Sequence, residues 1–270
     1  MYPRIKRREY NDIESILLYR KDIIFKDHAA KLDIFQDAIE LLFYLTTILN
    51  ARFLDDLTVT GNTLKGPRSI IPVLFERNNH YLLAAYKLAC IGLNNPAYLN
   101  LRAVFEGITH MYMLHLTDRE ADLLHKQQLG VLTADEEKEL KNKHHWLRPS
   151  RIREVLYIGE KKKQIDDFYI LISNSAHPGI KSAMGDFDYR KEVTFDVLTV
   201  SLALTAANLQ TITETHFDKI YAEEMEEIKI TMKKVAQELD GFIVNIIPNH
   251  PGLKNRLNPD LWTDTDQKSG

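Results

Sequence analysis

The central element of the fold is indicated by residues 94–116, which read NNPAYLNLRAVFEGITHMYMLHL. The triplet Asn94-Asn95-Pro96 supplies a capping residue followed by a proline suited to the first helical position. Beyond Pro96 the stretch is apolar on nearly every side, which is typical of a helix contacted by several neighbours. We therefore predict a central helix that runs to about Leu116.

Helical periodicity continues on both sides of this stretch, and Gly and Pro gather at a few joints instead of recurring every few residues as in an all-β fold. With a loop expected at 58–67, Pro72 would lie in the first turn of the third helix. The fold class is therefore all-α, a multi-helix bundle. Its other expected helices cover residues 10–25, 31–54, 70–91, 164–176, 194–215 and 221–239.

The chain is expected to form a single helical domain over residues 1–247, followed by a C-terminal arm or disordered tail over 248–270. Between residues 118 and 163 apolar residues become sparse and charged residues crowd in. Thr133 and Glu136 match the capping-box pattern, which predicts a short polar helix that runs toward His144. This part of the domain is therefore interpreted as a protruding polar helical hairpin.

The composition indicates which binding partners and which cellular compartment to expect. With 35 basic and 38 acidic residues, the formal charge is −3, so any attraction to an anionic partner must be local. Cys90 is the only cysteine, is expected to be a small buried residue, and fits a reducing compartment. Neither a signal peptide nor a membrane-spanning segment is recognised. We expect a cytoplasmic protein without membrane contact.

A ridge of polar groups crosses the apolar central helix. Arg102, Glu106 and His110 follow one another at four-residue spacing, so Glu106 can interact with both neighbours. Two interpretations are open. In the first, Arg102 and Glu106 form a buried structural pair that also bonds to His110 or, across helices, to Ser173. In the second, the ridge is part of an active site, because active sites need titratable groups with perturbed pKa values in a cleft.

A second polar group lies near the end of the helix expected at 164–176. His177 precedes Pro178, which places it at a helix C-terminus where a protonated imidazole is favoured, and Ser173 lies four residues earlier on the same face. Together the two groups give Arg102, Glu106 and His177 as candidate catalytic residues. The candidate ligand-binding residues are His110, Ser173 and Asn174.

A basic stretch, 141–163, has eight basic and two acidic residues, a net charge of +6. Basic groups interleaved with aromatic rings can bind a phosphate backbone and stack bases. Charge runs on helices are also commonly solvated faces, and both interpretations are kept. The candidate nucleic-acid-binding residues are Lys141, Lys143, Trp146, Arg148, Arg151, Arg153, Lys161, Lys162 and Lys163.

Metal and serine-hydrolase chemistry are not predicted. Glu106, His110 and His177 are suitable ligand types, but helical di-iron sites use Glu-x-x-His pairs from two helices, whereas Glu106 and His110 are spaced Glu-x-x-x-His. No Gly-x-Ser-x-Gly motif surrounds Ser173 or Ser175. We expect neither a metal nor another cofactor.

Two segments carry a family resemblance: residues 101–106, LRAVFE, and residues 169–178, YILISNSAHP. Across roughly residues 70–215 the chain resembles a group of bacterial and archaeal helical proteins with an Arg-x-x-x-Glu helix and a later Ser-x-x-x-His, loosely similar to the HEPN superfamily of abortive-infection and toxin–antitoxin proteins. The resemblance implies a compact helical bundle that often dimerises and acts in defence or stress. Only Arg102, Glu106, Ser173 and His177 carry over.

The chain departs from the HEPN pattern in the spacing between arginine and histidine. HEPN ribonucleases use an Arg and a His separated by four to six residues, whereas seven residues separate Arg102 from His110, and likewise Arg20 from His28.

Two functions follow from the sequence, and they leave enzyme status open. The favoured one is a non-enzymatic interaction module of defence or stress type that binds RNA, a protein or a small ligand. The alternative is a HEPN-like ribonuclease or another hydrolase that uses Arg102, Glu106 and His177, which requires Glu106 and His177 to converge in a solvent-reached cleft. A homodimer is compatible with either function, because the Met- and Leu-rich helices near the C-terminus could leave an apolar face exposed.

Overall fold

The computed structural model of the chain describes residues 13–60, 67–143, 148–156 and 158–176, together with positions 194, 197, 198, 201, 202 and 205. Every regular element in this part of the chain is a helix, which confirms the predicted all-α class. The helices are α1 (Ile13–Thr60), α2 (Pro67–Cys90), α3 (Asn94–Leu116), α4 (Asp118–Leu129), α5 (Ala134–Lys143), α6 (Pro149–Leu156) and α7 (Gly159–Ala176).

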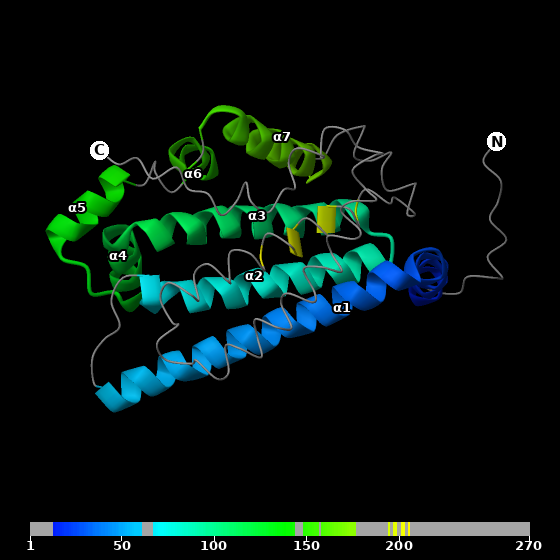
Figure 1. The fold of residues 1–270 in the computed structure, drawn as a ribbon, viewed down its shortest axis with the longest axis horizontal. Coiled ribbons are helices and arrows are strands. Elements are labelled where there is room, and N and C mark those ends of the chain that lie inside the picture. Colours follow the sequence, from blue (N-terminus) through cyan, green and yellow to red (C-terminus); the bar gives the residue numbers. More distant parts are fainter. Residues whose placement is uncertain are drawn as a thin grey trace.

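Helix α3 is central, as predicted. It lies between α2 on one side and α6 and α7 on the other, while α1 runs along the far side of α2 (Figure 1). The side chains of Phe105, Met111 and Leu114 are fully buried, and Val197 and Leu202 from the later helical positions join the same core. Other helices thus cover the apolar side chains of α3 on several sides, although Leu99 is exposed.

Helix α1 joins what the sequence predicted as two helices. The backbone of His28, with φ −130° and ψ 18°, leaves the helical region and kinks the element. The short segment before the kink is seen nearly end-on at the dark blue end of α1 in Figure 1. Ile24 and Leu32 are both buried, so the kink lets the two segments contribute to one core. The expected loop at 58–67 overlaps both helices, because α1 continues to Thr60 and α2 begins at Pro67.

Pro72 was predicted to lie in the first turn of its helix, and this was wrong. Helix α2 begins at Pro67, which takes the first-turn position that suits a residue without an N–H group. Pro72 lies inside the helix and is buried. Its missing N–H would have bonded to a carbonyl of the first turn, and its apolar ring packs into the interior.

The predicted cap of α3 was also wrong. The helix begins at Asn94, Leu93 takes the cap position, and no side chain caps the end. The Oδ1 atom of Asn94 instead accepts a 2.9 Å hydrogen bond from the hydroxyl of Thr194, and both side chains are buried. A contact across a hundred residues of chain has therefore replaced the local cap.

The polar region expected as a protruding hairpin, residues 118–163, contains α4, α5, α6 and the start of α7, and both α6 and α7 pack against α3. Helix α4 packs against α2 and α3 and buries Ala121 and Leu123, whereas α5 lies at the outer end of the molecule (Figure 1). The described helices include none that is both long enough and apolar enough to span a membrane. Cys90 is buried, as predicted. Helix α7 starts five residues earlier than expected, and the predicted helix at 221–239 and tail at 248–270 lie outside the described residues.

Candidate functional site

The polar groups of α3 meet those of α6 and α7 in what we call the polar seam. It consists of Arg102, Glu106, Arg153, Lys162, Asp166, Tyr169 and Ser173. The four members from α7 fall at positions i, i+4, i+7 and i+11, so they share one face of that helix. Helix α3 packs against both α6 and α7, which brings the three sets of side chains together.

Glu106 is the link between α3 and α7. Its Oε1 atom accepts a 2.9 Å hydrogen bond from Nε of Arg102 and a 2.7 Å hydrogen bond from the hydroxyl of Tyr169. The side chains of Arg102 and Glu106 are 30% and 29% exposed, so the pair is half-buried and not sealed in the core. The predicted Arg102–Glu106 pair is confirmed, and its partner across helices is Tyr169.

Arg153 links α6 to α7 at the other end of the seam. Its Nε donates a 2.8 Å hydrogen bond to Oδ1 of Asp166, and Nζ of Lys162 donates a 2.6 Å bond to Oδ2 of the same carboxylate. The guanidinium carbon of Arg153 lies 3.9 Å from the ring centroid of Tyr169, and that of Arg102 lies 5.4 Å from it. The ring of Tyr169 therefore joins the two ion pairs into one continuous cluster.

The pKa values of the seam residues follow from these contacts. Burial, and then the hydrogen bond to Glu106, raises the pKa of Tyr169, so it remains a protonated donor. The hydrogen bond to Glu106 raises the pKa of Arg102. Burial acts to raise the pKa of Asp166, but the hydrogen bonds from Lys162 and Arg153 outweigh it and lower the pKa. These contacts therefore stabilise the charged forms of Arg102 and Asp166.

His110 does not belong to this cluster. The described contacts of Glu106 lead to Arg102 and Tyr169 and not to His110, so the predicted three-residue ridge is incomplete. Nε2 of His110 is buried without a hydrogen-bond partner among the described residues. Burial, and next the nearby charge of Arg77, lowers the pKa of His110 to about 4. The imidazole is therefore neutral at pH 7.

The second predicted polar group is described only in part. Ser173 is buried, and its Oγ has no hydrogen-bond partner within 3.5 Å among the described residues. It lies close enough to the hydroxyl of Tyr169 to act against the rise in that group's pKa. The side chain of Asn174 and the whole of His177 lie outside the described part of the chain. Convergence of Glu106 and His177 thus stays a prediction.

The predicted nucleic-acid-binding residues do not behave as one surface. Arg153 is only 6% exposed and is held in the seam, so it faces the interior and not solvent. Arg151 is exposed but pairs with Glu154, and Lys162 pairs with Asp166. Exposed members without a described ion pair are Lys141, Arg148 and Lys163, while Trp146 and the side chains of Lys143 and Lys161 lie outside the described part.

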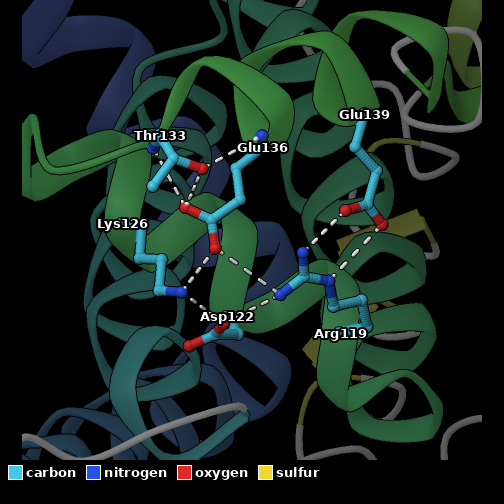
Figure 2. Close-up of polar contacts among 6 residues, drawn as sticks. All are labelled: Arg119, Asp122, Lys126, Thr133, Glu136 and Glu139. Atoms are coloured by element: carbon cyan, nitrogen blue, oxygen red, sulfur yellow. Dashed lines mark hydrogen bonds and ion pairs between the residues drawn. The ribbon is translucent and has the colours of Figure 1, made fainter.

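A separate polar network fixes α5 onto α4 (Figure 2). The predicted capping box is confirmed, because N of Thr133 donates to Oε2 of Glu136 at 3.0 Å and N of Glu136 donates to Oγ1 of Thr133 at 3.3 Å. Lys126 donates to Glu136 at 2.6 Å, and Arg119 donates to Glu139 at 2.6 Å. The contact with Lys126, followed by that with the backbone of Thr133, lowers the pKa of Glu136 to about 2.

The turn held by this network has an apolar tip. Helix α4 ends at Gly130, whose φ of 67° is the left-handed conformation that a glycine adopts without strain. The flanking Leu129 and Val131 are 55% and 58% exposed. Beside them lies a half-open hollow of about 400 Å³, lined by Gln127, Gly130, Leu132, Glu137, Leu140 and Lys141. We call this surface the hairpin tip.

Among the described residues, no group of three or more His, Cys, Asp or Glu side chains is placed to hold a metal ion. Comparisons of the chain with known protein families, curated proteins and solved structures gave no match. The site is therefore argued from its own geometry.

Sequence reasoning missed the part that α7 plays in the seam. Arg153 and Lys162 were predicted as nucleic-acid-binding residues, and Tyr169 was not among the predicted site residues. A signal was present, since the polar residues 162, 166, 169 and 173 recur at the spacing of one helical face.

Proposed function

We propose that the protein is a non-enzymatic helical interaction module that docks a partner protein at the hairpin tip. The observation that carries this proposal is the exposure of Leu129 and Val131, both more than half accessible, beside a hollow on a turn fixed by ion pairs. Exposed apolar groups beside a concave surface are characteristic of interaction sites. A turn already fixed by its own contacts loses little conformational entropy on binding.

The contacts of Glu106 support a non-enzymatic role. A carboxylate can accept several hydrogen bonds at once, and the bonds described for Glu106 are contacts within and between helices. Here two donors, Arg102 and Tyr169, converge on Oε1 of Glu106, and the carboxylate serves to hold α3 against α7. The neutral His110 has a buried Nε2 and is not paired with this carboxylate among the described contacts.

The chemistry of the hairpin tip favours a protein over a nucleic acid. Leu129 and Val131 contribute exposed aliphatic side chains, and the charged residues that line the hollow beside them are one acidic and one basic residue, Glu137 and Lys141. A nucleic-acid surface needs excess positive charge and usually aromatic rings for stacking. An apolar segment of another protein can cover Leu129 and Val131, and charged residues beside that segment can pair with Glu137 and Lys141.

The proposal is tested by cross-linking in cells that naturally produce the chain. A photoreactive residue replaces Val131, and a control replaces Lys138, which is exposed elsewhere on α5. We expect a discrete cross-linked protein from position 131 and not from 138, with its yield reduced about tenfold by Leu129→Ser, since that change removes one apolar contact. Equal products from both positions would contradict a specific docking surface.

The enzymatic alternative is tested in parallel. Wild type, Glu106→Ala and His177→Ala proteins, each checked for folding by circular dichroism, are incubated with a labelled pool of cellular RNA. The proposal expects no cleavage by any of them. Cleavage by the wild type that disappears in both folded variants would instead support the HEPN-like ribonuclease.

A further inference from the structure

Helix α5 has little apolar surface with which to hold its position. Its ten residues, ADEEKELKNK, include one large apolar side chain, Leu140, which is buried. Of the described helices, α5 packs mainly against α4. A helix of this length is only marginally stable in water by itself, so contacts with the rest of the protein must keep it folded and in place. One buried leucine supplies few such contacts.

Charged groups supply the other described contacts between α4 and α5 (Figure 2). Nζ of Lys126 lies 2.6 Å from Oε1 of Glu136, and Nη2 of Arg119 lies 2.6 Å from Oε2 of Glu139. Asp122 contacts both cations, at 3.2 Å from Lys126 and 3.5 Å from Arg119. The side chain of Glu136 is 13% exposed, so solvent screens its contacts less than it screens those of a fully exposed pair. We call Lys126–Glu136 and Arg119–Glu139 the α4–α5 ion pairs.

The hollow of the hairpin tip spans the joint that these ion pairs hold. Its lining residues come from α4 (Gln127), from the turn (Gly130 and Leu132) and from α5 (Glu137, Leu140 and Lys141). At Gly130 an added Cβ would meet no atom within 4 Å, so the turn itself is not packed against the rest of the protein at this point. Movement of α5 away from α4 would therefore remove one wall of the hollow.

We propose that the α4–α5 ion pairs act as a latch that holds α5 against α4 and thereby forms the hollow to which the partner protein binds. The inference rests on the proposed docking at the hairpin tip and adds its regulation. The hollow is complete while the latch is closed, and conditions that weaken the ion pairs reduce docking. Added salt is such a condition, because it screens partly exposed charges, whereas the apolar contact of Leu140 has no charge to screen.

The first test is amide hydrogen exchange of the full chain in 0.1 M and in 1 M sodium chloride, with the amides of α3 as an internal reference. The Debye length falls from about 10 Å to about 3 Å between these concentrations, so we expect the protection factors of α5 to fall about fivefold while those of α3 change little. The double variant Arg119→Gln/Lys126→Gln lacks both cations, and its α5 should be weakly protected at both concentrations. Lys138→Gln, which removes an exposed cation of α5 without a described ion pair, is the control and should behave like the wild type.

The second test connects the latch to docking. Photo-cross-linking from position 131 is repeated in cells that produce the double variant Arg119→Gln/Lys126→Gln or the control Lys138→Gln, and immunoblots check that the amounts of the chain are equal. We expect the cross-linked yield to fall about fivefold in the double variant and to stay at the wild-type level in the control, because only the double variant loses one wall of the hollow.

Two results would overturn the latch. The first is an α5 in the double variant that is as well protected at 0.1 M salt as in the wild type, because the ion pairs would then not hold the helix. The second is a lowered protection of α5 with an unchanged cross-linked yield, because docking would then not need the hollow. A wild-type chain that gives no cross-linked protein would instead refute the proposed docking and its regulation together, while the exchange experiment still decides whether the ion pairs hold α5.

Discussion

Tyr169 donates a 2.7 Å hydrogen bond to Glu106 across 63 residues of sequence. This bond converts a local pair on α3 into a contact between α3 and α7. The same Tyr169 ring packs against Phe105 with its centroid 6.0 Å away and carries the guanidinium of Arg153 on its face. One side chain therefore connects the core, the ion pairs and the packing of three helices.

Tyr169→Phe should separate the hydrogen bond from the packing. The ring and its neighbours are kept, and only the donor to Glu106 is lost. We expect the free energy of unfolding, measured by urea titration, to fall by about 1–2 kcal/mol, since a bond to a half-buried carboxylate is worth more than a neutral one. Tyr44→Phe, at an exposed tyrosine of α1, is the control and should change stability by less than about 0.5 kcal/mol. Equal losses in the two variants would show that the bond to Glu106 contributes nothing.

His110 should make stability depend on pH. Its pKa in the folded protein, about 4, lies below the ordinary value of 6.5, mainly because of burial and further because of Arg77. The unfolded chain therefore binds the proton more readily. This contribution to stability is complete above about pH 6.5 and is lost as the pH falls toward 4, by about 3 kcal/mol.

Urea titrations between pH 7.5 and 4 test this dependence. His110→Asn keeps a neutral polar group and should flatten the curve, whereas His80→Asn, at an exposed histidine, should leave its slope unchanged. A curve with the same slope in His110→Asn would assign the dependence to other groups.

Glu136 should control the acid stability of the hairpin. Its folded-state pKa of about 2 lies below the ordinary 4.5, first because of Lys126 and then because of the backbone of Thr133. The carboxylate contributes stability above about pH 4.5, and this contribution is lost as the pH falls toward 2. The protection factors of the α5 amides, which correct for the intrinsic pH dependence of hydrogen exchange, should therefore fall over this range. Glu136→Gln should exchange faster already at pH 7, and Glu137→Gln, one residue further along, should resemble the wild type. Identical exchange in Glu136→Gln and wild type would show that the ion pairs of Glu136 do not stabilise α5.

Features that depend on neighbouring residues were predictable from the sequence. The capping box needs only Thr133 and Glu136, three residues apart, and the structure has it as expected. The apolar surround of α3 also follows from one segment, because a helix without a polar face must be covered on several sides. The pair Arg102–Glu106 is likewise a property of four-residue spacing.

Features that depend on distant contacts were not predictable in the same way. Asn94 was expected to belong to a local capping triplet, but Thr194 competes for its side chain from a hundred residues away. Arg153 belongs to a basic run in the sequence, yet Asp166 and the ring of Tyr169 hold it inside. When a side chain has one possible partner nearby in the sequence and another that is distant, the packing of the helices decides which of the two it contacts. A single sequence does not show that packing.

A close approach of α2 to α3 at Gly107 gives the last prediction. A Cβ added at Gly107 would lie 3.2 Å from Cγ of the buried Asn78 and nearer still to its Oδ1. Gly107→Ala gains about 1 kcal/mol of helix propensity, but this overlap should cost more and lower the free energy of unfolding by about 1–2 kcal/mol. In an Asn78→Ala background the same change should be neutral or stabilising, because the obstructing amide is gone, and its Nδ2 has no hydrogen-bond partner among the described residues. A double-mutant cycle by urea titration measures this coupling, and simple additivity would show that the helices can separate at Gly107 without cost.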